Sequence, residues 1–437
     1  MILRLDDTDV ERNTQASVDS IFDGLNWLNL GWDEFYKQSE RIDLHTRMAW
    51  QIFEAGMAYR DFTPADANTE DRSAEAGSWL FNSGMRELSR DESDARSAAG
   101  ESFVLRFRVP RGIGRTVRFK DSVYGEQAKE ANDIEDFALL RSNGFPTYHM
   151  ASCADDVDIN ISHIIRGQDH LSNTFKHILI FEALGTKPPR FAHLPLLIAP
   201  DGSKLSKRKH GPVVSVTTYR DAGFLPHAYV NFLCLLGWSP KNNREQMTRQ
   251  EIMEAFSFEG INRSNAVVNF SDADPIDPKA LWLNGQHLRI MPVEELVPIV
   301  RQELEQAGLQ PVDEATFPPV VDVIRSRYTT LHDFVTKGRP YFADDFPMEP
   351  AAAVRLEEPN AREYLRELGA RLETTEEFSE AHIEKTLRDL AAEKNVKAGI
   401  LINGSRAILT GQSVGPSAFH VFTAIGRNQA IQRLKSA

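Results

Sequence analysis

Hydrophobic and polar positions follow two patterns along the chain. Alternating or short continuous apolar runs, which predict strands, occur in the first 210 residues, whereas apolar positions spaced by three to four residues, which predict helices, dominate beyond Pro212. Strands are predicted at 2–5, 103–109, 116–119, 137–140, 159–165 and 194–198. Helices are predicted at 17–29, 41–55, 174–184, 228–236, 293–307, 361–372 and 379–393, and the glycines at 31, 56 and 185 are expected to end the first three.

The segment from 159 to 198 is the most informative part of this pattern. Strand, helix and strand follow one another there, which is the crossover unit of a parallel sheet. The loop that follows, APDGSKLSKRKHG, then lies at the carboxyl edge of the sheet, where open α/β sheets bind their ligands. The sequence therefore predicts an α/β fold with a ligand site at this edge, followed by helical bodies.

Two polar stretches interrupt the regular patterns. Residues 64–100 are rich in Asp, Glu, Ser and Ala, which predicts short surface helices in an insertion. Residues 344–359 are rich in proline and acids, which predicts a hinge between two helical bodies.

Composition narrows the class of protein. The 437 residues carry 50 basic and 63 acidic side chains, a formal charge of −13. This charge argues only weakly against nucleic-acid binding, because a basic stripe on an acidic body still attracts phosphate. No apolar run approaches the roughly 20 residues that span a bilayer, and acids stand where a signal peptide would be apolar. We expect a cytoplasmic protein without membrane contact, in which Cys153 and Cys234 are buried thiols.

Lys204, Leu205, Ser206, Lys207 and Arg208 form the strongest local motif. Two ammonium groups and a guanidinium on a glycine-containing loop suit a polyphosphate, because they neutralise the charge that develops on leaving pyrophosphate. A closing loop can also deliver lysines in the transition state. A solvated basic loop is the alternative that the motif leaves open.

Tyr148 and Arg166 form a second candidate pair. Tyr148 is predicted to stand just before a strand, and Arg166 at the carboxyl end of the strand predicted at 159–165. An arginine in that place can bind a carboxylate through two parallel hydrogen bonds. A structural ion pair with Asp156 or Asp169 is the alternative.

Acidic residues follow the first predicted strand, in the segment from Arg4 to Asp9. They can receive an amino group, arrange a magnesium-bound phosphate, or cap the next helix. Capping is expected for Thr8 and Asp9, and the role of Asp6 stays open.

A late segment, Arg-Ser-Arg-Tyr, contains Arg325 and Arg327. Arginine and tyrosine together suit single-stranded RNA through stacking and through hydrogen bonds to base edges, although an arginine on a helix face is more often solvated. Four histidines in the first half form no recognisable metal or nucleophile set, namely His149, His163, His170 and His177.

The order of these motifs resembles the bacterial type of glutamyl-tRNA synthetase, a class I aminoacyl-tRNA synthetase. The segments that carry the resemblance are LRLDDTD, YKQSER, FPTYHMAS, HIIRGQDHLSN, RFAHLPLL, DGSKLSKR, AGFLPHAYVNFLCLLGW, LWLNG, RSRYTTL, AAEKNVKAG and ILTG. It implies ATP-dependent activation of glutamate to glutamyl-adenylate and transfer to the 3′ end of tRNA(Glu). ATP with Mg2+, L-glutamate and tRNA(Glu) are then the expected ligands, and a monomer the expected state.

The resemblance also implies roles for single residues. ATP is expected at Lys204, Leu205, Ser206, Lys207, Arg208, Asp169 and His170, with Lys204 and Lys207 catalytic. Glutamate is expected at Asp6, Tyr148, Ser152 and Arg166, with Arg166 on the side-chain carboxylate. The anticodon is expected at Arg325 and Arg327, and Arg327 falls where discriminating members of the family read it.

The implied domains follow the family. A Rossmann-type catalytic domain at 1–45 and 146–210 is interrupted by an α+β insertion at 46–145 that binds the acceptor end. A stem-contact domain at 211–292 precedes two all-helical anticodon-binding domains, at 293–349 and 350–437.

The sequence departs from the family in several places. The first ATP signature, a His-Ile-Gly-His-like motif, is absent together with the strand before it, so we expect about one βα unit, on the order of 30 residues, upstream of Met1. A wrong start is favoured over a truncated, catalytically inactive tRNA-binding paralogue, because the downstream ATP loop is intact. Asp6 replaces the Glu that is typical of the family, Ser152 replaces an Asn, and Gln168 replaces an acid. The insertion has no cysteine cluster that would suggest zinc, so none is expected.

Two related activities compete with this interpretation. A glutaminyl-tRNA synthetase shares the catalytic half but should end in β-barrels, whereas the last third of this chain is predicted to be helical. A non-discriminating enzyme that also charges tRNA(Gln) stays open, and Arg327 favours discrimination.

Overall fold

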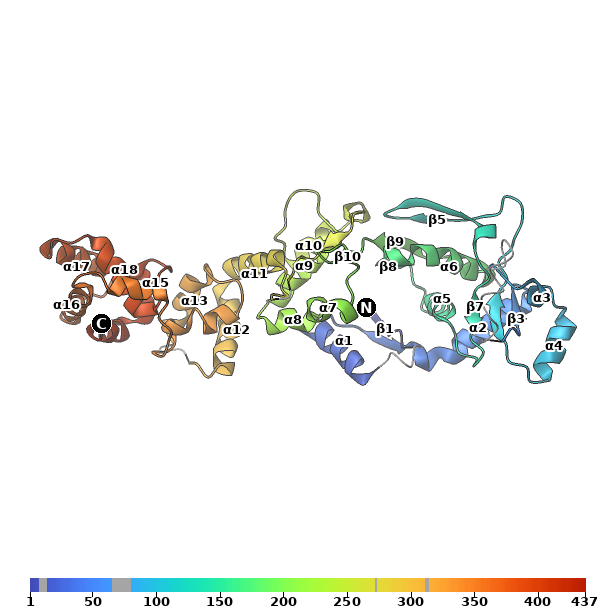
Figure 1. The fold of residues 1–437 in the computed structure, drawn as a ribbon, viewed down its shortest axis with the longest axis horizontal. Coiled ribbons are helices and arrows are strands. Elements are labelled where there is room, and N and C mark those ends of the chain that lie inside the picture. Colours follow the sequence, from blue (N-terminus) through green and yellow to red (C-terminus); the bar gives the residue numbers. More distant parts are fainter. Residues whose placement is uncertain (8–13, 65–79, 272, 311–313) are drawn as a thin grey trace. The chain divides into compact units, whose positions relative to one another are not determined.

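The computed structural model describes residues 1–7, 14–64, 80–271, 273–310 and 314–437 (Figure 1). The chain divides into two compact units, which are described separately. The first consists of Met1–Lys209, Leu233–Arg244 and Glu251–Val268, and the second of His210–Phe232, Glu245–Gln250 and Asn269–Ala437.

The strands that the structure describes are β1 (Ile2–Leu5), β2 (Glu34–Lys37), β3 (Ala58–Asp61), β4 (Val104–Phe107), β5 (Thr116–Asp121), β6 (Gly125–Glu130), β7 (Ala138–Leu140), β8 (His163–Gly167), β9 (Arg190–Leu194), β10 (Leu197–Ile198) and β11 (Ala266–Val267). The α-helices are α1 (Gln15–Trp27), α2 (Ile42–Glu54), α3 (Ser83–Arg86), α4 (Arg90–Ala98), α5 (Tyr148–Asp158), α6 (Leu171–Ala183), α7 (Lys207–His210), α8 (Val216–Asp221), α9 (Pro226–Gly237), α10 (Arg249–Ala255), α11 (Pro278–Ile290), α12 (Val293–Gln306), α13 (Phe317–Arg325), α14 (His332–Val335), α15 (Pro350–Ala353), α16 (Ala361–Glu373), α17 (Glu380–Glu393), α18 (Ala398–Thr410), α19 (Ala418–Ile425) and α20 (Arg427–Lys435).

A four-stranded sheet in the order β6-β5-β9-β8 forms the centre of the first unit. Strand β9 is parallel to both of its neighbours, and β6 is antiparallel to β5. Helix α6 connects β8 to β9 and packs against β5, with α5 beside it and α2 beyond (Figure 1). The predicted strand–helix–strand crossover is therefore confirmed. Strands β5 and β6 belong to this sheet although they fall within 46–145.

The alternation of buried and exposed side chains along β5 explains which face of this strand packs into the core. Val117, Phe119 and Asp121 are buried while Arg118 and Lys120 between them are exposed, so one face of the strand points into the core. The core joins α2, α5 and α6 to strands of this sheet and of the antiparallel sheet β3-β4-β7. Strands β1 and β2 form a separate parallel pair.

Three predictions for this unit were wrong in detail. Tyr148 begins helix α5 rather than preceding a strand. The strand predicted at 159–165 begins at His163, because the residues before it close α5 through a left-handed Asn160 (φ 59°). The strand predicted at 194–198 is divided, because Pro195 has no N–H for the ladder; β9 ends before it, and β10 pairs instead with β11.

Helix starts also differ from the predictions. The helix predicted at 174–184 already begins at Leu171. Helix α1 is capped by Thr14, whose side chain accepts a hydrogen bond from the backbone N–H of Ser17 at 3.3 Å. Thr8 and Asp9, the predicted capping residues, lie outside the described residues.

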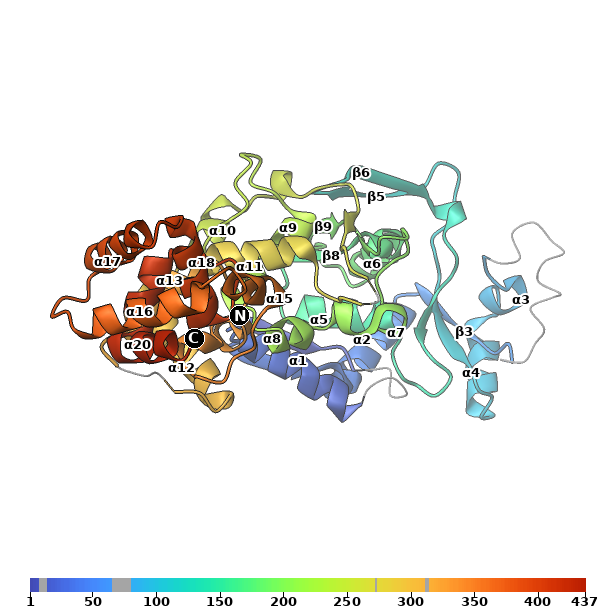
Figure 2. The same ribbon diagram turned by 60° about the vertical axis from the view of Figure 1, so that its left-hand side comes forward.

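Helices dominate the second unit, as predicted. Helix α16 packs against α17, α18 and α20 (Figure 2), and one hydrophobic core runs from Leu225 to Ala437. Ala352 and Leu356 are buried in this core, so the stretch 344–359 is packed rather than a free hinge. Across both units, none of the described helices is long and apolar enough to cross a membrane.

Candidate functional site

A cavity of about 360 Å³ in the first unit collects the four residues expected to hold glutamate. Asp6 follows β1, and Arg166 belongs to β8. Tyr148 and Ser152 lie one turn apart on the same face of α5. Three elements that are distant in the sequence therefore bring the predicted group together.

Arg4 and Asp156 also line this cavity, although the sequence did not assign them to it. The Arg4 guanidinium donates to Asp6 and to Asp156, at 2.8 Å in both cases. Burial raises the pKa of Asp156, and the charge of Arg4 only partly opposes this shift. The signal that could have identified Arg4 is its position two residues before Asp6, on the same face of a strand.

The Arg166 guanidinium is held by neutral acceptors. Its partners are Tyr148 Oη at 3.1 Å, Thr174 Oγ1 at 2.7 Å, His193 Nε2 at 3.3 Å, His177 Nδ1 at 3.4 Å and the His170 carbonyl at 3.4 Å. In the part of the chain that the structure describes, Asp156 pairs with Arg4 and Asp169 with Lys204, and no carboxylate forms an ion pair with Arg166. The alternative interpretation of Arg166, an ion pair with one of these two acids, is therefore wrong.

Two hydrogen-bonded pairs, buried except for the partly buried His149, fix the acceptors of Arg166. The sequence did not indicate this network. His177 Nε2 lies 3.2 Å from His149 Nδ1, and His193 Nδ1 lies 2.6 Å from Asp121 Oδ2. Burial, reinforced by the charge of Arg166, holds the pKa of His177 well below its ordinary value. Burial likewise lowers the pKa of His149 to about 4. These histidines form hydrogen-bonded supports for the arginine rather than a metal site.

Lys204 and Asp169, both expected to contact ATP, form an ion pair of 2.6 Å. Burial raises the pKa of Asp169, but the hydrogen bond and charge of Lys204 outweigh burial and hold it below its ordinary value. The next residue, His170, places its Nδ1 3.2 Å from Tyr148 Oη. The residues expected to bind ATP and those expected to bind glutamate are thus contiguous.

The basic loop folds back on β10. Lys204 forms a bridge with Ile198, and the Leu205 N–H donates to the Leu197 carbonyl at 2.9 Å. Ser206 Oγ then accepts from the backbone N–H of Lys209 at 3.3 Å, at the start of α7. The side chains of Lys207 and Arg208 lie outside the described part of the structure.

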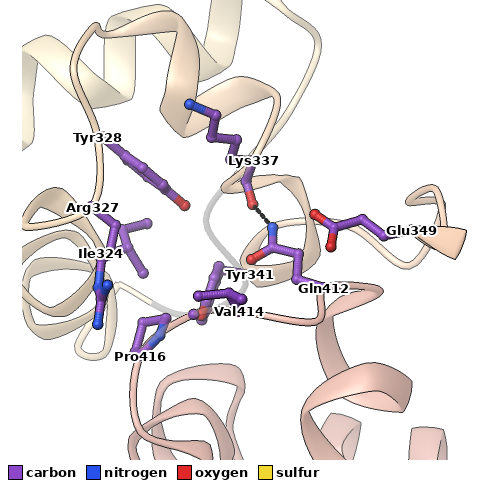
Figure 3. Close-up of a pocket in the computed structure, with 10 residues that line it drawn as sticks. Ile324, Arg327, Tyr328, Lys337, Tyr341, Glu349, Gln412, Val414 and Pro416 are labelled. Atoms are coloured by element: carbon purple, nitrogen blue, oxygen red, sulfur yellow. Dashed lines mark hydrogen bonds between the residues drawn. The ribbon is translucent and has the colours of Figure 1, made fainter. Parts of the chain in front are cut away.

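A second cavity, of about 330 Å³, lies in the helical unit beside Arg327 (Figure 3). Tyr328, Tyr341 and the exposed Val414 are among the residues that line it. The Gln412 amide donates to the Lys337 carbonyl at 2.6 Å, which ties together the two segments that form the walls.

The structure does not bring Arg325 to this cavity. Its guanidinium donates to the Met291 carbonyl and forms an ion pair of 2.6 Å with Asp322. Arg325 therefore braces the segment between α11 and α12, whereas Arg327 faces the cavity.

Comparison with known proteins extends these observations. Residues 1–274 match the family described as tRNA synthetases class I (E and Q), catalytic domain, and residues 293–437 match the family described as anticodon binding domain. The chain is 53% identical over 439 residues to the Glutamate–tRNA ligase of Solibacter usitatus (strain Ellin6076), covering 100% of this chain and 92% of that protein. It is 35% identical over 446 residues to a Glutamate–tRNA ligase of Thermus thermophilus, with the same two coverages, 100% and 92%.

A solved structure agrees with these relatives. The crystal structure of a glutamate tRNA ligase from Elizabethkingia meningosepticum CCUG26117 in complex with its amino acid matches with a TM-score of 0.85 at 27% identity, covering 100% of this chain and 91% of that one. Both halves of the chain, the fold and the full-length relatives thus agree, and the chain belongs to the glutamate–tRNA ligase family of class I tRNA synthetases.

Proposed function

We propose that this chain charges tRNA(Glu) with L-glutamate in two steps, and that the cavity lined by Arg166 is the glutamate site. In the first step the α-carboxylate of glutamate attacks the α-phosphate of ATP, giving glutamyl-adenylate and pyrophosphate. In the second, the terminal ribose hydroxyl of the tRNA takes the glutamyl group and AMP leaves. The observation that carries this proposal is an arginine with neutral partners in a cavity that adjoins the Lys204–Asp169 pair.

Positioning and charge neutralisation account for the roles of the residues. Arg166, with Tyr148, receives the side-chain carboxylate of glutamate, and Asp6, with Ser152 nearby, receives its amino group. Lys204 and Lys207 neutralise the phosphates. No three His, Cys, Asp or Glu side chains among the described residues could hold a metal ion by themselves, so we assign Mg2+ to the phosphates of ATP, as part of the substrate.

The cavity beside Arg327 is the proposed anticodon site. The Arg327 guanidinium offers donors to the edge of an unstacked base, and the largely buried rings of Tyr328 and Tyr341 form the apolar wall beside it. We assign the acceptor end to the insertion at 46–145, the stem to 211–292, and the anticodon to the two helical domains. Arg325 contributes there by holding the backbone that leads to Arg327. We further expect the enzyme to act as a monomer in the cytoplasm.

Aminoacylation with two crossed variants tests the proposal. The purified chain should charge tRNA(Glu) with glutamate when ATP is present, and should charge tRNA(Gln) far less. Arg166→Gln should raise the KM for glutamate while leaving the Kd for tRNA near that of the parent. Arg327→Ala should raise the Kd for tRNA while leaving the KM for glutamate near that of the parent.

Other outcomes have defined meanings. Binding of tRNA with a steep salt dependence but without ATP–pyrophosphate exchange would make the chain a non-catalytic tRNA-binding protein. Efficient charging of tRNA(Gln) would make it non-discriminating.

A further inference from the structure

We propose that the neutral acceptors around Arg166, and His177 in particular, set the preference of this site for an anionic side chain over the corresponding amide. This inference rests on the proposed function, because it takes the Arg166 cavity as the glutamate site. It assigns His177 as a positioning residue, which acts through Arg166 and not on the substrate.

The hydrogen bonds of His177 define its charge state. An arginine can only donate, so His177 Nδ1, 3.4 Å from Arg166 Nη1, must present a lone pair. The other nitrogen, Nε2, then carries the proton and donates to His149 Nδ1 at 3.2 Å. His177 is therefore the neutral Nε2–H tautomer. The same reasoning makes His193 neutral, with its Nδ1–H donating to Asp121 Oδ2.

Other arginines of this unit have carboxylates as partners. Arg4 lies against Asp6 and Asp156, and Arg41 lies against Asp155 at 2.8 Å. In such pairs the carboxylates offset the cost of removing the guanidinium from water. Arg166 is likewise only partly exposed. Within the described residues its hydrogen-bond acceptors are two hydroxyls, two imidazoles and a backbone carbonyl, all of them neutral.

The consequence is a cation fixed in direction that no carboxylate among the described residues pairs with. A carboxylate that enters the cavity supplies the missing charge, whereas a carboxamide can accept a hydrogen bond but leaves the cation unpaired. A site built for one partner rejects an analogue that leaves its polar group unpaired. A carboxylate placed at His177 would supply the charge internally and remove this preference.

Replacing His177 by a matched pair of residues separates charge from shape. His177→Asn retains a neutral oxygen near the position of Nδ1, and His177→Asp has the same shape with a negative charge. The neighbouring arginine keeps the new carboxyl ionised. We expect His177→Asp to raise the KM for glutamate about 100-fold and to reduce the discrimination against glutamine. His177→Asn should raise that KM no more than about tenfold, and both should leave the KM for tRNA close to that of the parent.

Thr174 provides a second pair on a different helix position, because its Oγ1 lies 2.7 Å from Arg166 Nη2. Thr174→Asn and Thr174→Asp carry the same comparison if melting curves show that His177→Asp does not fold. An equal rise in the KM for glutamate within a pair would overturn the inference, since shape and not charge would then decide. If the parent chain shows no glutamate-dependent charging, the proposed function itself fails and the inference fails with it. A rise confined to the Asp member of a pair supports it.

Discussion

Acid should weaken the first unit through His149, whose environment opposes protonation. Burial is the main cause, and the charge of Lys176 adds to it while Glu135 opposes it; together they lower the pKa from 6.5 to about 4. Because the folded pKa is the lower one, the unfolded chain binds more protons between these values. The contribution of neutral His149 to the free energy of unfolding is complete above pH 6.5 and is lost as the pH falls towards 4.

The size of this effect follows from the two pKa values. A shift from 6.5 to about 4 corresponds to about 3 kcal/mol once the pH is below both values. At pH 5 about 2 kcal/mol of it has been lost. Few carboxylates have titrated by pH 5, so the histidine contribution is visible there before general acid unfolding begins.

Denaturant unfolding at pH 7 and pH 5 measures this contribution. Among the described residues, four tryptophans lie in the first unit and Trp282 lies in the second, so tryptophan fluorescence mainly follows the first unit. His149→Gln also loses the contact with His177, so only the change between the two pH values is compared. The parent should lose about 2 kcal/mol more than the variant between pH 7 and pH 5. Equal losses in the two proteins would refute the argument that His149 is held neutral by its surroundings.

Three further perturbations have defined outcomes. Lys204→Ala should lower ATP–pyrophosphate exchange about 100-fold with little change in Tm, because its pair with Asp169 is largely exposed; a large drop in Tm would instead indicate a structural role. Gly411→Ala should cost about 3 kcal/mol, since Gly411 has φ +67° and an added Cβ would collide with the Pro347 carbonyl; an unchanged denaturation midpoint would contradict this. Arg433→Met should cost about 3 kcal/mol, because the buried guanidinium donates to three backbone carbonyls; urea unfolding followed by far-UV circular dichroism checks it.

An element of this fold could be predicted from the sequence where its signal is local. The crossover from β8 to β9 could be predicted because apolar spacing and a glycine stop are local properties. Ile159 and Ile161 led to a wrong prediction, since an apolar–polar–apolar run looks like a strand but here closes a helix. A run this short has the same pattern in both structures, and only the hydrogen bonds distinguish them.

The supports of Arg166 could not be predicted in the same way. Asp121 meets His193 only because β5 pairs with β9, and the two residues are 72 positions apart in the sequence. Tyr148 and Arg166 were proposed as a pair from their places beside predicted strands, Ser152 was identified through a family pattern, and the structure brings all three to one cavity. The partners that hold them come from tertiary pairing, which no single segment encodes.

The continuous core of the helical unit has a consequence for the cavity beside Arg327. Its walls meet through Lys337 and Gln412, which are 75 positions apart, and both wall segments are anchored in the core that ends at Ala437. Such a cavity has no stability of its own, because it exists only while the whole unit is folded. A proteolytic cut that releases α20, whose Leu434 is fully buried, should therefore abolish the cavity without touching any residue that lines it. The last turn of the chain and a cavity distant from it in sequence are thus gained or lost as one cooperative event.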